Sequence, residues 1–309
     1  MAKISGSTAI GAGFRVISNN PGAVLLWGLT HLLIFTVPIL GIYGAIVPAY
    51  VDLFQGMAAG KRLPPDASSL MHLQLRMMVL QPVLILCATA TRAILGGAVF
   101  RAVLEPRNKG FGYIRLARQE LWLAIVYLVA AFMAILAIVC LIVPIIIGSV
   151  ISMALAHGSG TNLWLLPAVI APLLTILLGL GLWAAIRLSL ALPMTFAHGK
   201  FMLFEAWPLA RGNSLRMLGV GLGVYAMMIL GQMVITVLVI GTGFLVLEHS
   251  AIDINQILHQ KWDLTLARYW PWFAGIAAAG SMIAGLTYPI IYAPLADIYR
   301  QLAVKEDAA

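Results

Sequence analysis

Six long apolar runs limit what this chain can fold into more than any other feature of its sequence. A helix needs about 20 apolar residues to cross the hydrocarbon core of a bilayer. We expect spans over 22–47, 77–100, 121–147, 163–192, 218–246 and 270–295. With 62% hydrophobic and 10% charged residues, a soluble domain would expose too much apolar surface to stay dispersed. The sequence therefore predicts an all-α, multi-pass membrane helix bundle, with residues 1–309 as a single domain.

Several prolines lie inside the apolar runs, and each can kink or end a helix locally. They are Pro38, Pro82, Pro144, Pro172 and Pro289. The links on one side of the bundle are expected over 52–76, 157–162 and 248–268. The last link mixes isoleucines and tryptophans with polar residues, which is typical of a helix lying in the membrane interface.

Lysine and arginine are unequally divided between the two sides of the predicted bundle. Fourteen lie on one side: Lys3, Arg15, Arg92, Arg101, Arg107, Lys109, Arg115, Arg118, Arg187, Lys200, Arg211, Arg216, Arg300 and Lys305. Five lie on the other: Lys61, Arg62, Arg76, Lys261 and Arg268. Because cytoplasmic loops carry the excess of Lys and Arg, both termini are predicted in the cytoplasm. The same rule accounts for the net charge of +8, so nucleic acid is not expected as a partner.

Three basic and aromatic segments interrupt the apolar pattern on the side predicted to be cytoplasmic. We call them the elbows: the first is Ser7–Arg15, the second Arg92–Arg118 and the third Arg187–Arg216. Each contains a short amphipathic stretch that precedes a long apolar run. We expect short interfacial helices in the elbows, each leading into a hairpin of spans.

The elbows recur at similar distances, which predicts an internal repeat. Arg15, Arg118 and Arg211 are separated by 118 − 15 = 103 and 211 − 118 = 93 residues, and Arg92 and Arg187 by 187 − 92 = 95. The repeat units would cover about 5–104, 105–197 and 198–303. Two spans per unit make these parallel repeats around an axis along the membrane normal. The alternative is that basic residues simply recur every two helices in any membrane protein.

The candidate binding residues are the cations of the elbows. Arg92 and Arg187 lie inside apolar runs, where a charge is costly unless it snorkels to the surface or is paired. Either they snorkel to lipid phosphate, or they face the bundle and bind an anionic group. The full set of candidates for an anionic lipid headgroup or a cytoplasmic protein partner is Arg92, Arg101, Arg118, Arg187, Lys200, Arg211 and Arg216. Asp297 is expected to form a structural ion pair with Arg101 or Arg187.

Motifs of enzyme chemistry are missing from the sequence. It has no Gly-x-Ser-x-Gly elbow, no phosphate-binding loop and no His-Glu-x-x-His pair, and its six histidines lack metal-site spacing. His31 is expected to be a buried hydrogen-bonding residue. Small residues spaced for close helix packing occur at Gly219 and Gly223, and at Ala277, Ser281 and Gly285. We therefore expect a protein that is not an enzyme and has no catalytic, cofactor-binding or metal site.

The third elbow, RLSLALPMTFAHGKFMLFEAWPLARGNSLR, and the ending YAPLADIYRQL carry a family resemblance. They resemble the six-helix membrane domain found in some glycerophosphodiester phosphodiesterases and in related stand-alone bacterial inner-membrane proteins. The matching residues are Arg187, Pro193, Ala206 and Ser214. The soluble phosphodiesterase barrel, with its metal ligands, has no counterpart in this chain. The resemblance therefore implies a membrane module of the bacterial inner membrane without the enzyme activity.

These features predict a non-enzymatic inner-membrane protein that binds lipid headgroups or a protein partner and supports the cell envelope. The alternative is a transporter or lipid-translocating protein that uses the axis between the three repeats. The spans offer few polar side chains to line such a path, namely His31, Gln81, Thr89, Thr91 and Gln232.

Overall fold

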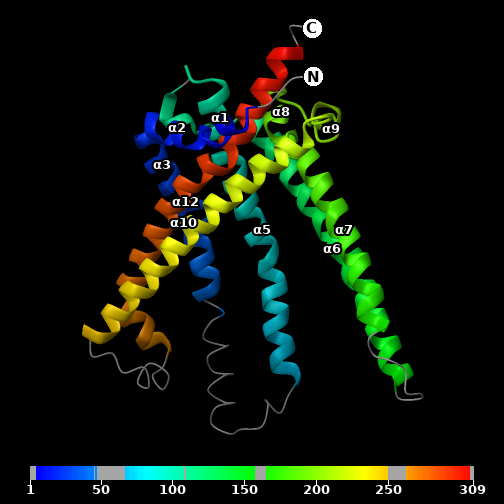
Figure 1. Cartoon of the computed structure of the whole chain (residues 1–309). Coiled ribbons are helices and arrows are strands. Elements are labelled where there is room, and N and C mark those ends of the chain that lie inside the picture. Colours follow the sequence, from blue (N-terminus) through cyan, green and yellow to red (C-terminus); the bar gives the residue numbers. More distant parts are fainter. Residues whose placement is uncertain are drawn as a thin grey trace. The chain divides into compact units, whose positions relative to one another are not determined.

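A computed structural model describes residues 5–44, 46, 67–107, 109–156, 165–249 and 262–306. Throughout these residues the regular elements are helices, which confirms the predicted all-α class (Figure 1). They are α1 (Gly6–Ile10), α2 (Ala12–Asn19), α3 (Pro21–His31), the π-helix η1 (Leu32–Thr36), α5 (Ala67–Leu104), the 3-10 helix η2 (Gly110–Tyr113), α6 (Arg118–Ala156), α7 (Leu165–Leu188), α8 (Ala191–His198), α9 (Ala206–Leu209), α10 (Ser214–His249) and α12 (Trp262–Glu306).

Six helices of the described chain are long and apolar enough to cross a membrane, which confirms a multi-pass membrane protein. The candidate spans are Pro21–Gly44, Gln74–Leu104, Gly110–Val150, Leu174–His198, Ser214–Val237 and Trp270–Ala303. The central part of α6 is largely exposed, including Phe132 at 66% and Val150 at 62%. Lipid, in which apolar side chains are as stable as in a core, is the environment that such a helix requires.

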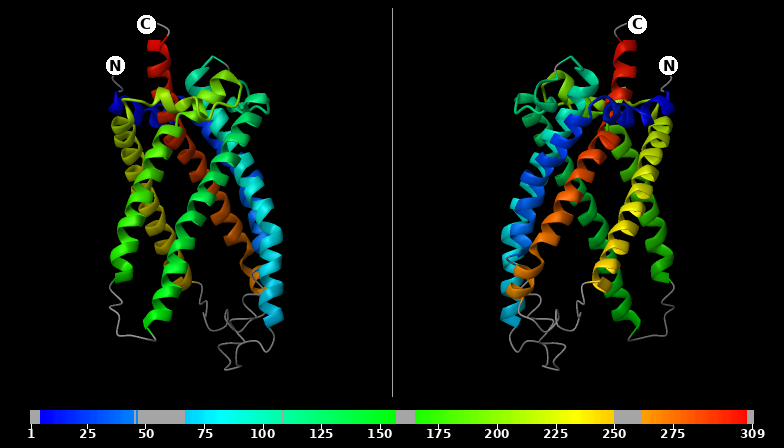
Figure 2. Two further views of the ribbon diagram at one scale, coloured as in Figure 1. Left: turned by 90° about the vertical axis from the view of Figure 1, so that its right-hand side faces the viewer. Right: turned by 90° about the vertical axis from the view of Figure 1, so that its left-hand side faces the viewer.

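The prolines do not end the helices that contain them. Pro82 lies inside α5, Pro144 inside α6, Pro172 inside α7 and Pro289 inside α12, and each of these helices continues as one ribbon (Figures 1 and 2). Pro38 follows η1. The wider turn of a π-helix is one of the local adjustments that re-satisfy backbone groups near a proline in a span.

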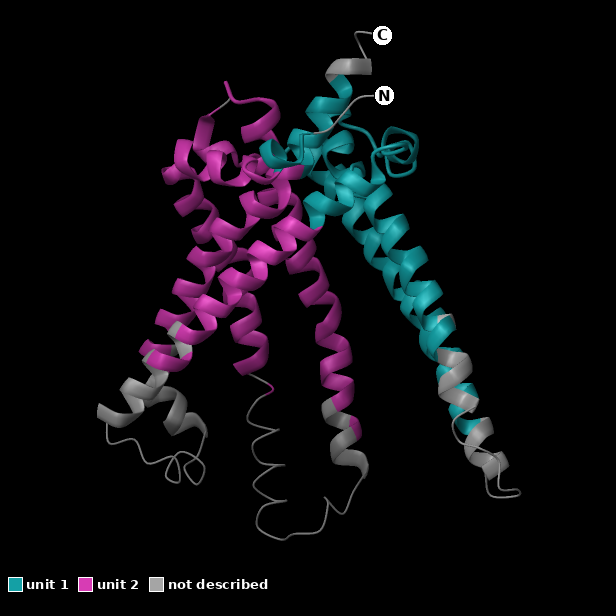
Figure 3. Cartoon of the chain, viewed as in Figure 1, with its two compact units in different colours: residues 1–9, 116–221, 295–309 teal, residues 10–115, 222–294 magenta. Residues whose placement is uncertain are grey.

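The chain divides into two compact units (Figure 3). Unit 1 contains residues 1–9, 116–221 and 295–309, and unit 2 contains residues 10–115 and 222–294. The helices α10 and α12 contribute residues to both units. The three-repeat arrangement stays a prediction. The predicted links over 157–162 and most of 52–76 and 248–268, including the interfacial helix expected there, lie outside the described residues.

In unit 2, α3 and α12 pack with their backbones in close contact. A Cβ added to Gly285 would lie 2.7 Å from the Gly28 backbone nitrogen, and one added to Gly28 would lie 2.9 Å from Met282 Cα. Gly13 of α2 approaches the Ile290 backbone in the same way. Gly285 and the buried Ser281 therefore confirm the predicted small-residue packing on this helix, whereas Gly219 has no such neighbour within 4 Å.

In unit 1, α6 and α7 run antiparallel and in contact (Figure 1). Glu120 stabilises the start of α6 because its Oε2 accepts a hydrogen bond of 3.0 Å from the Ala117 backbone N–H, one half of a capping box. The preceding residue, Gln119, donates from Nε2 to the Phe196 carbonyl at 3.2 Å. This bond ties α6 to α8, so the start of α6 and the third elbow lie at the same end of unit 1.

Candidate functional site: the elbows

The third elbow is a packed structure and not an open loop. After α7, the chain forms α8, turns at Gly199 and continues to α9. Gly199 has a left-handed backbone (φ 60°) and caps α8 with its N–H on the Thr195 carbonyl at 2.9 Å, as glycine does at helix ends. The Thr195 hydroxyl accepts the Met202 N–H at 3.2 Å. Phe196, Leu203, Ala206 and Ala210 are buried, and α8 packs against α6.

Arg187, in the last turn of α7, makes cation–π contacts with two tryptophans. The guanidinium carbon lies 4.4 Å from the ring centroid of Trp183 and 5.1 Å from that of Trp207. The two indoles meet edge to face, with their centroids 4.8 Å apart. Trp183 is one turn earlier on α7, and Trp207 is on α9. The sequence identified Arg187 as a candidate, but Trp207 becomes its neighbour only through the folding of the elbow.

The second elbow turns sharply at Phe111–Tyr113, where three successive residues have positive φ angles of 47°, 62° and 65°. Such backbone conformations cost free energy unless the surroundings hold them. Trp27 Nε1 donates to the Gly112 carbonyl at 2.8 Å, and Arg101 Nη1 donates to the Tyr113 carbonyl at 2.6 Å. A side chain at Gly112 would meet Leu26 Cδ2 at 2.9 Å. The close approach and the positive φ both favour glycine at 112.

Arg101 is placed differently from what a lipid-binding role requires. It is only 1% exposed, and its bond to the Tyr113 carbonyl anchors the second elbow to α5. This arrangement fits a structural function, so Arg101 is not part of the exposed cationic surface of the elbows. The side chains of Arg92, Arg118, Lys200, Arg211 and Arg216 are exposed, and that of Arg187 is half-buried.

Exposed cations of the elbows lie beside large exposed apolar side chains in the sequence. Within unit 1, Leu116 (82% exposed) lies near Arg118, Leu215 (82%) adjoins Arg216, and Phe204 (62%) follows Lys200. Within unit 2, Phe111 (75%) lies between Lys109 and Arg115. Apolar side chains in such exposed positions next to cations are typical of surfaces that enter the headgroup layer of a membrane.

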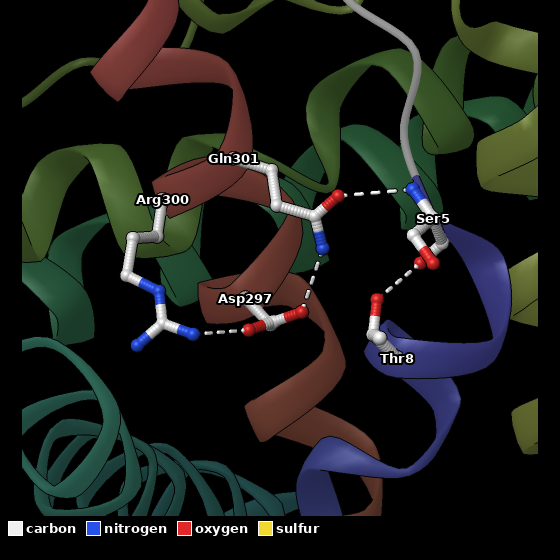
Figure 4. A network of polar contacts seen from close by, with 5 residues as sticks. All are labelled: Ser5, Thr8, Asp297, Arg300 and Gln301. Carbon is white, nitrogen blue, oxygen red and sulfur yellow. Dashed lines mark hydrogen bonds and ion pairs between the residues drawn. The ribbon is translucent and has the colours of Figure 1, made fainter.

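Asp297 forms an ion pair with Arg300, a partner that the sequence analysis did not name (Figure 4). Its Oδ1 accepts from Arg300 Nη2 at 2.6 Å and its Oδ2 from Gln301 Nε2 at 2.7 Å. Gln301 Oε1 in turn accepts the Ser5 backbone N–H at 3.0 Å. The spacing of three residues between Asp297 and Arg300 on a helix is a sequence signal for this pair. Arg187 lies beside two indoles instead, and the pair with Arg101 stays a prediction.

A second polar group lies inside unit 2, within the candidate spans. Thr36 Oγ1, at the end of η1, lies 2.8 Å from Ser281 Oγ and 3.3 Å from His31 Nδ1. These contacts confirm His31 as a hydrogen-bonding residue, although it is half-buried. Among the other polar residues of the spans, Gln81 and Gln232 are exposed, and Thr91 donates to the Cys87 carbonyl of its own helix.

No three His, Cys, Asp or Glu side chains of the described chain are close enough together to hold a metal ion. No protein-family model, curated protein or solved structure matches this chain. The resemblance to the membrane domain of glycerophosphodiester phosphodiesterases therefore stays a prediction that rests on the third elbow and the C-terminal motif.

Proposed function

We propose that this chain is a bacterial inner-membrane protein that binds anionic lipid headgroups through its elbows and supports the cell envelope without being an enzyme. One observation carries the proposal: exposed cations adjoin large exposed apolar side chains in the second and third elbows. Each basic residue near an anionic membrane surface contributes about 1 kcal/mol. The neighbouring apolar side chains add affinity when they enter the boundary between headgroups and acyl chains.

The experiment compares retained lipids in native mass spectrometry. The full chain is purified and incubated with equal amounts of phosphatidylglycerol and phosphatidylcholine. The test variant is Lys200→Gln with Arg211→Gln and Arg216→Gln. The matched control is Arg76→Gln, because Arg76 is also exposed but belongs to the side predicted to face away from the cytoplasm.

We expect the wild-type protein and the Arg76 control to retain phosphatidylglycerol preferentially. The preference of the triple variant should fall by at least about fivefold, the equivalent of one lost surface cation. If the triple variant keeps the wild-type preference, this surface does not bind anionic lipid. A cytoplasmic protein partner would then be the better proposal for it.

A transport function is the second candidate, and the hydrogen bonds among His31, Thr36 and Ser281 favour it. Polar residues inside spans frequently mark substrate or ion pathways, and π-helices are frequent at functional sites. Thr36→Val combined with Ser281→Ala should then reduce solute or lipid flux in liposomes while the protein still reconstitutes. The absence of flux for the wild-type protein would remove this candidate.

A further inference from the structure

Arg187 is a half-buried cation that lies beside two indole rings. In unit 1, its guanidinium carbon lies 4.4 Å from the ring centroid of Trp183 and 5.1 Å from that of Trp207, and these two centroids are 4.8 Å apart. A guanidinium directs all five of its N–H groups outward within its own plane. The contacts with the indoles stabilise the charge through cation–π attraction but satisfy none of its hydrogen-bond donors.

Within the part of the chain that the structure describes, no hydrogen bond satisfies the donors of Arg187. Nε is buried and has no acceptor among these residues. Among the residues that the structure describes, Arg187 makes no ion pair: the Asp297 carboxylate of the same unit contacts Arg300. Leaving a buried donor of a charged group without an acceptor is costly. An acceptor from outside the chain would bind the Nη groups of this half-buried side chain, because Nε itself is buried.

The position of Arg187 limits which acceptor is available. It lies in the last turn of a helix that belongs to a candidate membrane span, and tryptophan is enriched at the level of lipid headgroups. The planar fork of arginine matches a phosphate with two parallel hydrogen bonds, whereas lysine offers only a point charge. Phosphate is thus the acceptor that best fits both the location and the shape of the group.

We propose that Arg187, which lies beside Trp183 and Trp207, binds one phosphate group of an anionic phospholipid through the Nη groups of its guanidinium. This site rests on the proposed function, since it is the specific part of a surface that otherwise attracts anionic lipid by charge alone. The contacts with the two indoles restrict the Arg187 side chain before the lipid arrives, which lowers the entropic cost of binding.

The test uses Arg187→Lys in the full chain, which keeps the positive charge but removes the planar fork. Arg76→Lys is the matched control, because Arg76 is an exposed arginine that also lies near the end of a candidate span but outside the elbows. Binding of phosphatidylglycerol is titrated by native mass spectrometry. In a parallel arm, inorganic phosphate competes with the lipid.

We expect Arg187→Lys to weaken the tightest phosphatidylglycerol site by about tenfold or more, the effect of losing hydrogen bonds to a charged group. Arg76→Lys should change it by less than about twofold. The preference for phosphatidylglycerol at the remaining, weaker sites should persist. Displacement of the lipid by millimolar inorganic phosphate in the wild type alone would show that free phosphate is the preferred source, and would overturn the lipid assignment.

Unchanged lipid affinity of a folded Arg187→Lys protein would overturn the proposal and leave Arg187 as a contact that only holds α9 on α7. If Arg187→Lys does not fold, Trp207→Phe is measured in its place. Phenylalanine keeps an aromatic ring beside Arg187, so the tight lipid site should persist. Complete loss of the tight lipid site would favour the purely structural function of Arg187. The triple variant at Lys200, Arg211 and Arg216 tests the elbow surface independently of the Arg187 site, because Arg187 is intact in it.

Discussion

Three arginines with similar sequence contexts have three different environments. Arg92 is exposed, Arg187 is half-buried beside two indoles, and Arg101 is 1% exposed and donates to a backbone carbonyl. Each lies near the predicted cytoplasmic end of an apolar run, so hydropathy alone treats them alike. The difference arises from tertiary contacts, because the Tyr113 carbonyl and the Trp207 ring are brought into place by the turns of the elbows.

Arg101→Gln should destabilise the protein without changing its lipid preference. The shorter, neutral side chain loses the charged hydrogen bond to Tyr113 O, and leaving a buried acceptor unpaired costs about 1–3 kcal/mol. The measurement is the midpoint of thermal unfolding in detergent, together with the phosphatidylglycerol preference of the folded fraction. Arg118→Gln, a change at an exposed arginine, is the control and should alter stability by no more than about 0.5 kcal/mol. A stable Arg101→Gln protein with weakened lipid binding would contradict the structural assignment.

At the scale of elements, helix packing in unit 2 depends on backbone contact between α3 and α12. Without a hydrophobic driving force between helices in lipid, close van der Waals packing holds them together, and small residues permit the approach. Gly28 and Gly285 lie at this contact, and Ser281 adds a hydrogen bond to Thr36.

Gly285→Ala should therefore destabilise unit 2, since the new methyl group would lie 2.7–2.9 Å from the backbone of α3. Inserting a methyl group into such packing costs about 1–3 kcal/mol. Gly219→Ala is the matched control, because a Cβ there has no neighbour within 4 Å. Both are compared by thermal unfolding in the same detergent. Equal midpoints for the two variants would show that α3 and α12 do not pack through Gly285.

The second elbow should depend on the indole nitrogen of Trp27. Trp27→Phe keeps an aromatic ring in a fully buried position but removes the hydrogen bond to the Gly112 carbonyl. We expect a loss of about 1–3 kcal/mol and faster proteolysis of the turn at 111–113. Trp270→Phe, at an exposed indole, is the control and should leave both unchanged. Proteolysis at the wild-type rate in Trp27→Phe would contradict the anchoring by Trp27.

The number of spans and the helical class could be predicted from the sequence, because runs of more than 20 apolar residues have few alternatives in a membrane. The short helices of the elbows were also expected from amphipathic patterning, and they are present as α1, α2, η2, α8 and α9. The Trp27–Gly112 and Thr36–Ser281 contacts were not predicted. They join residues 85 and 245 positions apart, and no local pattern encodes such distances.

At the scale of the whole molecule, the two ends of the described chain belong to the same unit. The Ser5 N–H donates to Gln301 Oε1 at 3.0 Å, and Gln301 is fixed by Asp297 (Figure 4). A chain with six membrane spans returns to the side on which it started, so the contact agrees with the number of spans. The positive charges predict which side this is, since fourteen of the nineteen Lys and Arg residues are assigned to the side of the termini.

Both termini should therefore be cytoplasmic, and cysteine labelling in intact bacterial cells checks this. Cys87 and Cys140 are first replaced by serine. A single cysteine is then introduced at Ser5, which is exposed near the N-terminus, or at Gln74, which is exposed near the predicted outer end of α5. A membrane-impermeant maleimide should label the cysteine at 74 in intact cells, and the cysteine at 5 only after the cells are opened. The bias of Lys and Arg between the two sides determines the orientation. Adding five or more arginines to the outer links, for example within 157–162, should therefore reduce the fraction of molecules with cytoplasmic termini. Labelling of the cysteine at 5 in intact cells would reverse the topology and would place the elbows, together with the proposed lipid site at Arg187, on the outer face.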